Sequence, residues 1–84
     1  MRQTIKNAED LGDFVRATRK SQGLRQDDAA GASGVSESFF GKVESGNTSV
    51  NWGLLFRVLS DLGIEVSVDI TESAAAMLTQ SDDQ

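Results

Sequence analysis

Residues 26–46, QDDAAGASGVSESFFGKVESG, carry the local signals that decide the fold of this chain. Residues 26–33 are rich in alanine, and acidic side chains near their start suit the positive end of a helix dipole. Gly34 then interrupts the pattern, and Ser36 is placed to cap a further helix that stops at Gly46. Two short helices joined by a tight turn that contains glycine predict a helix-turn-helix.

Longer helices are expected on both sides of this motif. Asn7 can cap a helix that runs to Gln22, because apolar residues recur at spacings of three and four while the opposite face is basic. Residues 52–62 predict a fourth helix, closed by Gly63. Its apolar positions cover more than the single stripe that one small core can use, so part of this helix is expected to face a partner.

Residues 64–70, IEVSVDI, alternate strictly between apolar and polar side chains, as in a half-buried strand. A lone strand has no hydrogen-bonding mate in a helical chain, so we expect it to pair with its copy in a second subunit. The short TIK segment near the N-terminus is an alternative mate. The expected dimerisation residues are Ile64, Val66, Val68 and Ile70.

The predicted fold is therefore an all-α bundle of four to five helices with one C-terminal β-strand. Residues 1–70 would form one small domain that includes the strand. Residues 71–84, TESAAAMLTQSDDQ, have few apolar residues and no firm period, and we expect a flexible tail. A chain of 84 residues buries about 60% of its unfolded surface, so a second copy or another partner is expected to add stability.

The acidity of the chain is concentrated near its C-terminus. The formal net charge is -5, with eight basic and thirteen acidic residues. Residues 1–60 hold all eight bases and seven acids, which gives +1, and residues 61–84 hold the other six acids, which gives -6. The first sixty residues can therefore present a locally basic face to nucleic acid.

The composition also narrows the possible chemistry. The chain has no Cys, His or Tyr, which excludes disulfides, thiolate chemistry, imidazole bases and nearly every zinc or iron site, and no cofactor is expected. The sequence pairs no nucleophile with a base, which favours a binding protein over an enzyme. The N-terminus lacks the apolar core of a signal peptide, and no apolar run approaches the roughly 20 residues of a membrane span. We expect a cytoplasmic protein.

The span from Leu11 to Asp69 resembles the Xre type of helix-turn-helix, the group that includes the phage repressors. Within this group it is most similar to the HipB-like antitoxins, which implies a lambda-repressor-like bundle. The positions that carry the resemblance are Gln26, Ala30, Gly34, Val35, Phe40, Val43 and the E-x-G of Glu44 to Gly46. Ala30 is small where two helix backbones approach, and Gly34 accepts a left-handed turn.

The resemblance implies that the second helix of the motif lies in the major groove of DNA. Lys42 would read guanine or contact a phosphate, and Glu37 would accept from cytosine and reject wrong sites. The implied base-reading residues are Ser36, Glu37, Ser38 and Lys42. The implied phosphate-contacting residues are Arg25, Gln26, Asn47 and Thr48, together with the helix N-terminus at Ser36.

Several other positions in the motif have more than one interpretation. Arg19 and Glu44 match a pair that forms an internal ion pair in relatives, although two separate surface charges are the alternative. Phe40 is expected in the core, whereas Phe39 could lie at its rim, contact a thymine methyl group or belong to a protein interface. Gly41 weakens the second helix by up to about 1 kcal/mol and could permit close approach to DNA.

The functional hypothesis is a repressor that binds a palindromic operator in double-stranded DNA as a homodimer. The resemblance to HipB-like proteins further implies an antitoxin that neutralises a HipA-like serine/threonine kinase toxin. The alternatives are a stand-alone Xre-type regulator, an antitoxin of another toxin class, and a protein-interaction module without DNA binding. The tail would be inert or would order on a toxin, with Met77 and Leu78 as anchors.

Overall fold

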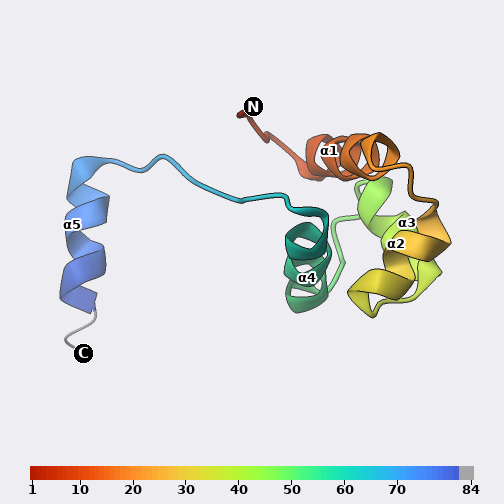
Figure 1. Ribbon diagram of the computed structural model, residues 1–84. Helices are drawn as coiled ribbons and strands as arrows, with labels where there is room; N and C mark the ends of the chain where they lie inside the picture. Colours follow the sequence, from red (N-terminus) through yellow and green to blue (C-terminus); the bar gives the residue numbers. More distant parts are fainter. Residues whose placement is uncertain (82–84) are drawn as a thin grey trace.

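The computed structural model describes residues 1–81, and five helices run through this part of the chain (Figure 1). Their bounds are α1 Ala8–Ser21, α2 Gln26–Ser33, α3 Glu37–Glu44, α4 Trp52–Leu62 and α5 Glu72–Ser81. The predicted helix-turn-helix bundle is confirmed, with α2 and α3 as its central pair. None of the helices described is both long and apolar enough to cross a membrane.

Side-chain caps fix where the predicted helices begin. The backbone N–H of Asp10 donates to Oδ1 of Asn7 at 2.8 Å, and that of Phe39 donates to Oγ of Ser36 at 3.0 Å. The turn between α2 and α3 depends on Gly34, whose φ of +72° lies in the left-handed region that side chains disfavour. These local signals set the angle at which α3 leaves α2.

The hydrophobic core lies where α1 to α4 meet. The packed helix pairs are α1 with α3, α2 with α3, α2 with α4, and α1 with α4. The buried apolar residues are Val15, Ala29, Ala30, Phe40, Val43, Val58, Leu59 and Leu62. Phe40 is fully buried, as the sequence predicts, and the two alanines let α2 approach its neighbours closely. The core therefore holds α3 by its inner face.

Gly12 and Gly41 have opposite steric surroundings. A Cβ on Gly12 would lie 2.5 Å from the backbone oxygen of Glu44 and 2.7 Å from that of Val43, so α1 touches the end of α3 backbone to backbone. A Cβ on Gly41 would meet nothing within 4 Å. The absence of a side chain is therefore required for packing at Gly12, whereas the fold itself does not require it at Gly41.

We predict that Gly41→Ala raises the free energy of unfolding by up to about 1 kcal/mol, because alanine favours a helix and the space is open. Gly12→Ala should destabilise the protein, because the backbone of α3 would have to move. Urea unfolding followed by circular dichroism compares the variants. Gly31→Ala, at another open helical position, is the control and should also stabilise. Equal effects at Gly12 and Gly41 would contradict this packing.

The predicted C-terminal strand is not formed within the part of the chain that the structure describes. Residues 64–70, which we call the arm, are extended but have no strand pairing. A single copy offers this segment no sheet edge, so its pairing across a dimer stays a prediction. Ile64 differs from the other alternating residues, because its N–H donates to the oxygen of Leu59 at 2.8 Å and its half-buried side chain packs on the core.

The segment predicted to be a flexible tail, residues 71–84, contains a helix. Residues 72–81 form α5, whose first turn is capped by Thr71, where Oγ1 accepts from the N–H of Ala74 at 3.1 Å. The sequence interpretation overlooked this cap, although AAAML itself favours a helix. Figure 1 shows α5 standing apart from the bundle at the end of the arm. Residues 82–84 of the predicted tail lie outside the described part.

Candidate nucleic-acid interface

The residues predicted to read bases lie together on the outer face of α3. Ser36 precedes the helix, and its cap places Glu37 and Ser38 in the first turn. Lys42 lies four residues after Ser38 and therefore on the same side of the helix, one turn further along. All four side chains are exposed. The structure thus brings these residues to one surface, with a base at one end and an acid at the other.

The opposite face of α3 is committed to the bundle. Phe40, Val43 and Glu44 are buried there, and Phe39 is half-buried against the hydrophobic core. Of the alternatives for Phe39, the structure favours packing at the rim of the core. A helix can enter a DNA groove while staying packed on its domain if its outer face is exposed and its inner face is buried in the core. The two faces of α3 meet this requirement.

The carboxylate of Glu44, at the end of α3, joins three elements of the bundle. Its side chain is 1% exposed, and Nε of Arg19 lies 2.5 Å from Oε2 while Nη2 donates to Oε1 at 3.1 Å. Gln26, the first residue of α2, donates from Nε2 to Oε1 at 2.9 Å. Arg16 adds a contact of 3.5 Å from Nε to Oε1. Helices α1, α2 and α3 are therefore tied at one buried carboxylate.

The contacts around Glu44 decide its charge state. Burial by itself raises the pKa of this carboxyl, but hydrogen bonds from Arg19 and Gln26 and the positive charge of Arg19 outweigh burial, so the pKa lies below its ordinary value. The same hydrogen bond with Glu44 acts in the opposite direction on Arg19 and raises the pKa of its guanidinium. Both groups stay charged near neutral pH. Removing either one would leave an unpaired charge in the interior.

We predict that Glu44→Gln lowers the free energy of unfolding by about 3–5 kcal/mol at pH 7, because Arg19 loses its counter-charge. The pKa of Glu44 is lower in the folded protein than in the unfolded chain. The stabilisation that its charge gives to the folded protein is therefore fully present above the unfolded pKa of about 4.3, and it is lost as the pH falls through the folded pKa. The difference between wild type and variant should therefore shrink in acid.

Denaturant unfolding measured from pH 7 to pH 3 tests this prediction. The control is Glu37→Gln, which removes an exposed carboxylate from the same helix and should change stability by less than about 0.5 kcal/mol. A Glu44→Gln variant as stable as wild type at pH 7 would show that the buried contacts do not hold the bundle.

Arg25, a predicted phosphate contact, is already engaged by acids. Its Nη2 lies 2.6 Å from Oδ2 of Asp27, its Nε donates to Oδ1 of the same carboxylate at 3.1 Å, and Asp28 lies 3.7 Å away. The hydrogen bond from Arg25 lowers the pKa of Asp27. Arg25 remains exposed, so a phosphate could reach it, but only in competition with these carboxylates.

The other predicted phosphate contacts are placed in different ways. Gln26 is half-buried and gives one amide hydrogen to Glu44, which leaves its second amide hydrogen for a phosphate. Asn47 and Thr48 are exposed in the loop between α3 and α4. Oδ1 of Asn47 accepts from the N–H of Ser49 at 2.7 Å, which fixes that side chain and leaves its amide group as a donor. These roles stay predictions.

The sequence interpretation missed two partners of Glu44. Arg16 was assigned to an exposed basic face, but it also donates to the backbone oxygen of Glu44 at 3.3 Å and is 44% exposed. Gln26 was expected to face a phosphate alone. The spacing of Arg16 and Arg19 at i and i+3 was a signal that both could reach one carboxylate. Their target, Glu44, lies 28 residues after Arg16 and 25 after Arg19, which local patterns do not reveal.

Comparison with known proteins agrees with this geometry. The helix-turn-helix domain model matches residues 10–66, which is more than half of the chain. The chain belongs to the helix-turn-helix family. The uncharacterized HTH-type transcriptional regulator y4mF of Sinorhizobium fredii is 38% identical over 68 residues, covering 81% of this chain and 90% of the relative. This helix-turn-helix protein is therefore a member of a DNA-binding regulator family, as its sequence predicts.

Solved structures extend the likeness in fold. A chain in the structure of the HipA-HipB-O2-O3 complex superposes with a TM-score of 0.75 at 18% identity, covering 84% of this chain and all of that one. The restriction-modification controller protein C.AhdI from Aeromonas hydrophila gives 0.62 at 31% identity, covering 69% and 88%. The lambda-repressor-like, HipB-like fold predicted from the sequence is confirmed.

Proposed function

We propose that this helix-turn-helix regulator is a sequence-specific repressor that binds a palindromic operator as a homodimer. The observation that carries the proposal is the outer face of α3, where Ser36, Glu37, Ser38 and Lys42 are exposed together. The inner face of the same helix is held by Phe40 and by the buried carboxylate of Glu44. A rigidly supported helix with a polar outer face suits readout of base edges in the major groove.

Each residue of this face has a distinct chemical task. Lys42 supplies positive charge for guanine O6 and N7 or for a phosphate. Glu37 accepts from the N4 amino group of cytosine and repels phosphates, so it favours some sequences by rejecting others. Oγ of Ser36 already accepts the capping bond, which leaves its hydroxyl hydrogen to donate. Gly41 is open to the outside, so the helix backbone can approach the groove closely there.

We predict that Lys42→Ala combined with Ser38→Ala abolishes specific binding to a palindrome from the promoter of this gene. Each well-formed base contact contributes about 1–3 kcal/mol of discrimination, so the double variant should bind that palindrome no better than unrelated DNA. Gel-shift titration measures DNA binding, and circular dichroism shows whether the variant is folded. Lys20→Ala, at an exposed lysine of α1, is the control and should bind like wild type.

The salt dependence of binding gives a second readout of the same experiment. Specific binding by wild type should weaken steeply as salt rises, because contacted phosphates release counterions. If the Lys42 and Ser38 double variant keeps wild-type affinity, α3 is not the reading helix. If wild type itself binds no DNA at low salt, a protein-interaction role replaces the proposed one.

We infer that the homodimer forms through the arm and α4. Val66, Val68 and Ile70 are exposed at 45, 78 and 49%, although strands with this pattern normally bury their apolar side. Pairing two arms across a twofold axis would satisfy both their backbone groups and their apolar side chains. The same axis would place two copies of α3 about 34 Å apart on a palindrome.

We predict that Val68→Asp weakens the homodimer by at least tenfold, because a charge would be buried between the arms at a cost above roughly 1.4 kcal/mol. Ser67→Asp introduces the same charge on the polar side of the arm and is the matched control. Sedimentation equilibrium measures both dissociation constants. Equal dimers for the two variants would rule out pairing through the apolar side of the arm.

We further propose that the protein is the antitoxin of a HipA-like kinase toxin. The fold shared with a chain of the HipA-HipB-O2-O3 complex supports this proposal, as does the resemblance of the sequence from Leu11 to Asp69. A kinase-like reading frame beside this gene, whose toxicity is relieved by co-expression of this protein, would support the antitoxin role. An unrelated neighbour and no relief of toxicity would leave a stand-alone regulator.

A further inference from the structure

The outer face of α4 carries an aromatic pair that its own bundle does not cover. Trp52 is 73% exposed and Phe56 is 45% exposed, and their ring centroids lie 6.1 Å apart at an interplanar angle of 48°. A hollow of about 440 Å³ adjoins Phe56 and lies between it and the start of the arm at Ile64 and Val66. We call Trp52, Phe56 and this hollow the α4 face.

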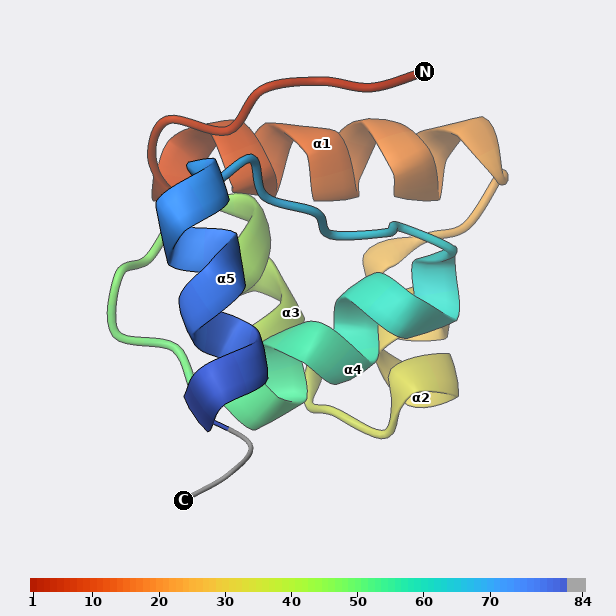
Figure 2. The same cartoon turned by 90° about the vertical axis from the view of Figure 1, so that its left-hand side faces the viewer.

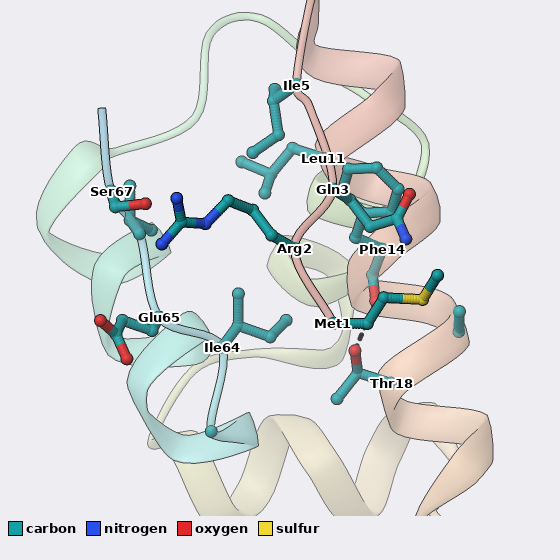
Figure 3. Close-up of a pocket in the computed structure, with 13 residues that line it drawn as sticks. Met1, Arg2, Gln3, Ile5, Leu11, Phe14, Thr18, Ile64, Glu65 and Ser67 are labelled. Carbon is teal, nitrogen blue, oxygen red and sulfur yellow. Dashed lines mark hydrogen bonds between the residues drawn. The ribbon is translucent and has the colours of Figure 1, made fainter. Parts of the chain in front are cut away.

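The start of the arm is attached to its own bundle, but the rest of the arm leaves it. Residues 63–67 line a cavity of about 750 Å³ together with α1 and the N-terminal segment, where Ile64 faces Leu11 and Phe14 (Figure 3). Beyond this point the arm runs outward to α5 (Figure 1), and Figure 2 views the molecule from the side of α5. The arm therefore begins at the edge of the α4 face and carries α5 away from it.

The composition of the arm explains why α5 does not fold back on its own chain. No glycine or proline occurs after Gly63, so the chain has no residue that favours a tight reversal there. Five of the eight residues from 64 to 71 are β-branched, which favours extended backbone. Seven extended residues span about 23 Å, which is enough to deliver α5 to a neighbouring molecule.

The helix α5 is itself incomplete as an isolated element. None of the main helix packings of the described chain involves α5. Met77 is 57% exposed and Leu78 is 61% exposed, and they lie on the same side of α5 as Ala74. A ten-residue helix is marginal in water without tertiary contacts, so α5 needs an apolar surface to rest on.

We propose that α5 of each chain docks on the α4 face of a second copy, so that the two arms cross and the helices are exchanged. This inference rests on the proposed homodimer and specifies what covers Trp52. The exchange is reciprocal, as a twofold interface requires, because each chain supplies one α5 and one α4 face. The exposed apolar side of the arm continues this surface from Phe56 to α5 and forms the middle of the interface.

The exposed apolar area matches what a stable dimer needs. The large exposed apolar residues concerned are Trp52, Phe56, Val66, Val68, Ile70, Met77 and Leu78. Scaling the roughly 150–250 Å² of a large aromatic side chain by each exposed fraction gives an upper bound on the order of 800 Å² uncovered per chain. Burial in two copies would remove on the order of 1,600 Å², the standard size of a specific interface.

The absence of cysteine from the chain allows a direct test with the full-length protein. One preparation carries Phe56→Cys and another carries Met77→Cys, and the two are mixed and oxidised mildly. We expect a disulfide-linked dimer that contains one chain of each kind, identified by mass spectrometry. Replacing Met77→Cys by Thr79→Cys, on the opposite side of α5, should reduce the yield several-fold. A single chain with both Phe56→Cys and Met77→Cys should form covalent dimers and few internal disulfides.

Trp52 gives an independent readout, because it is the only tryptophan in the sequence. In the wild-type dimer its emission should lie at shorter wavelength than in Met77→Asp, where α5 no longer covers the ring. Thr79→Asp, with the same charge on the other side of α5, should leave the emission of the wild type unchanged. Each variant is also checked for helix content and for binding to the promoter palindrome.

The outcomes separate this inference from the proposed function. Internal disulfides in the double variant without mixed dimers would show that α5 docks on its own chain, and the exchange would be wrong. A second outcome would be a wild-type dimer that binds its operator but gives no cross-link and shows the Trp52 emission of a solvated ring. That result would also overturn the exchange, but it would leave the proposed function intact. A wild-type monomer that binds no DNA would contradict the proposed function itself.

Discussion

A single buried carboxylate holds α3, the helix proposed to read DNA, in place. Glu44 ends α3, and its charge is compensated by Arg19 and Arg16 from α1 while Gln26 reaches it from the start of α2. Around it the spacing of the backbones is tight enough that Gly12 cannot carry a side chain. The angle of α3 therefore depends on an electrostatic contact whose partners would each be costly to leave unpaired in the interior.

This arrangement leaves little positive charge for DNA. Arg19 is buried, Arg16 is partly drawn toward Glu44, and Arg25 is bound by Asp27 and its neighbour. The exposed side of α3 carries one lysine near one end and one glutamate at the other. Since non-specific attraction to DNA scales with the number of phosphates neutralised, one copy would bind weakly. The proposed homodimer would double every contact, and the proposed rejection of wrong sites by Glu37 would then contribute more to specificity than to affinity.

The C-terminal end also carries apolar surface that the proposed second copy would cover. The arm and α5 expose apolar side chains that a lone chain would be expected to bury, and the outer face of α4 presents an aromatic pair next to them. Core packing and the proposed dimer contact thus involve different parts of α4. Val58, Leu59 and Leu62 face inward, whereas Trp52 and Phe56 face outward. This division explains why the apolar pattern of α4 covers more than one stripe.

The sequence by itself determined the helices, their caps and the turn at Gly34, because these depend on neighbours a few residues apart. The resemblance of the sequence to Xre-type proteins also singled out the four candidate base readers at the start and along the exposed side of α3. Three features required the tertiary structure: the contacts of Gln26 and Arg16 with Glu44, the inward packing of Ile64, and the separation of α5 from the bundle. Each depends on residues far apart in the chain or on a surface that one copy lacks, and local propensity carries no information about such partners.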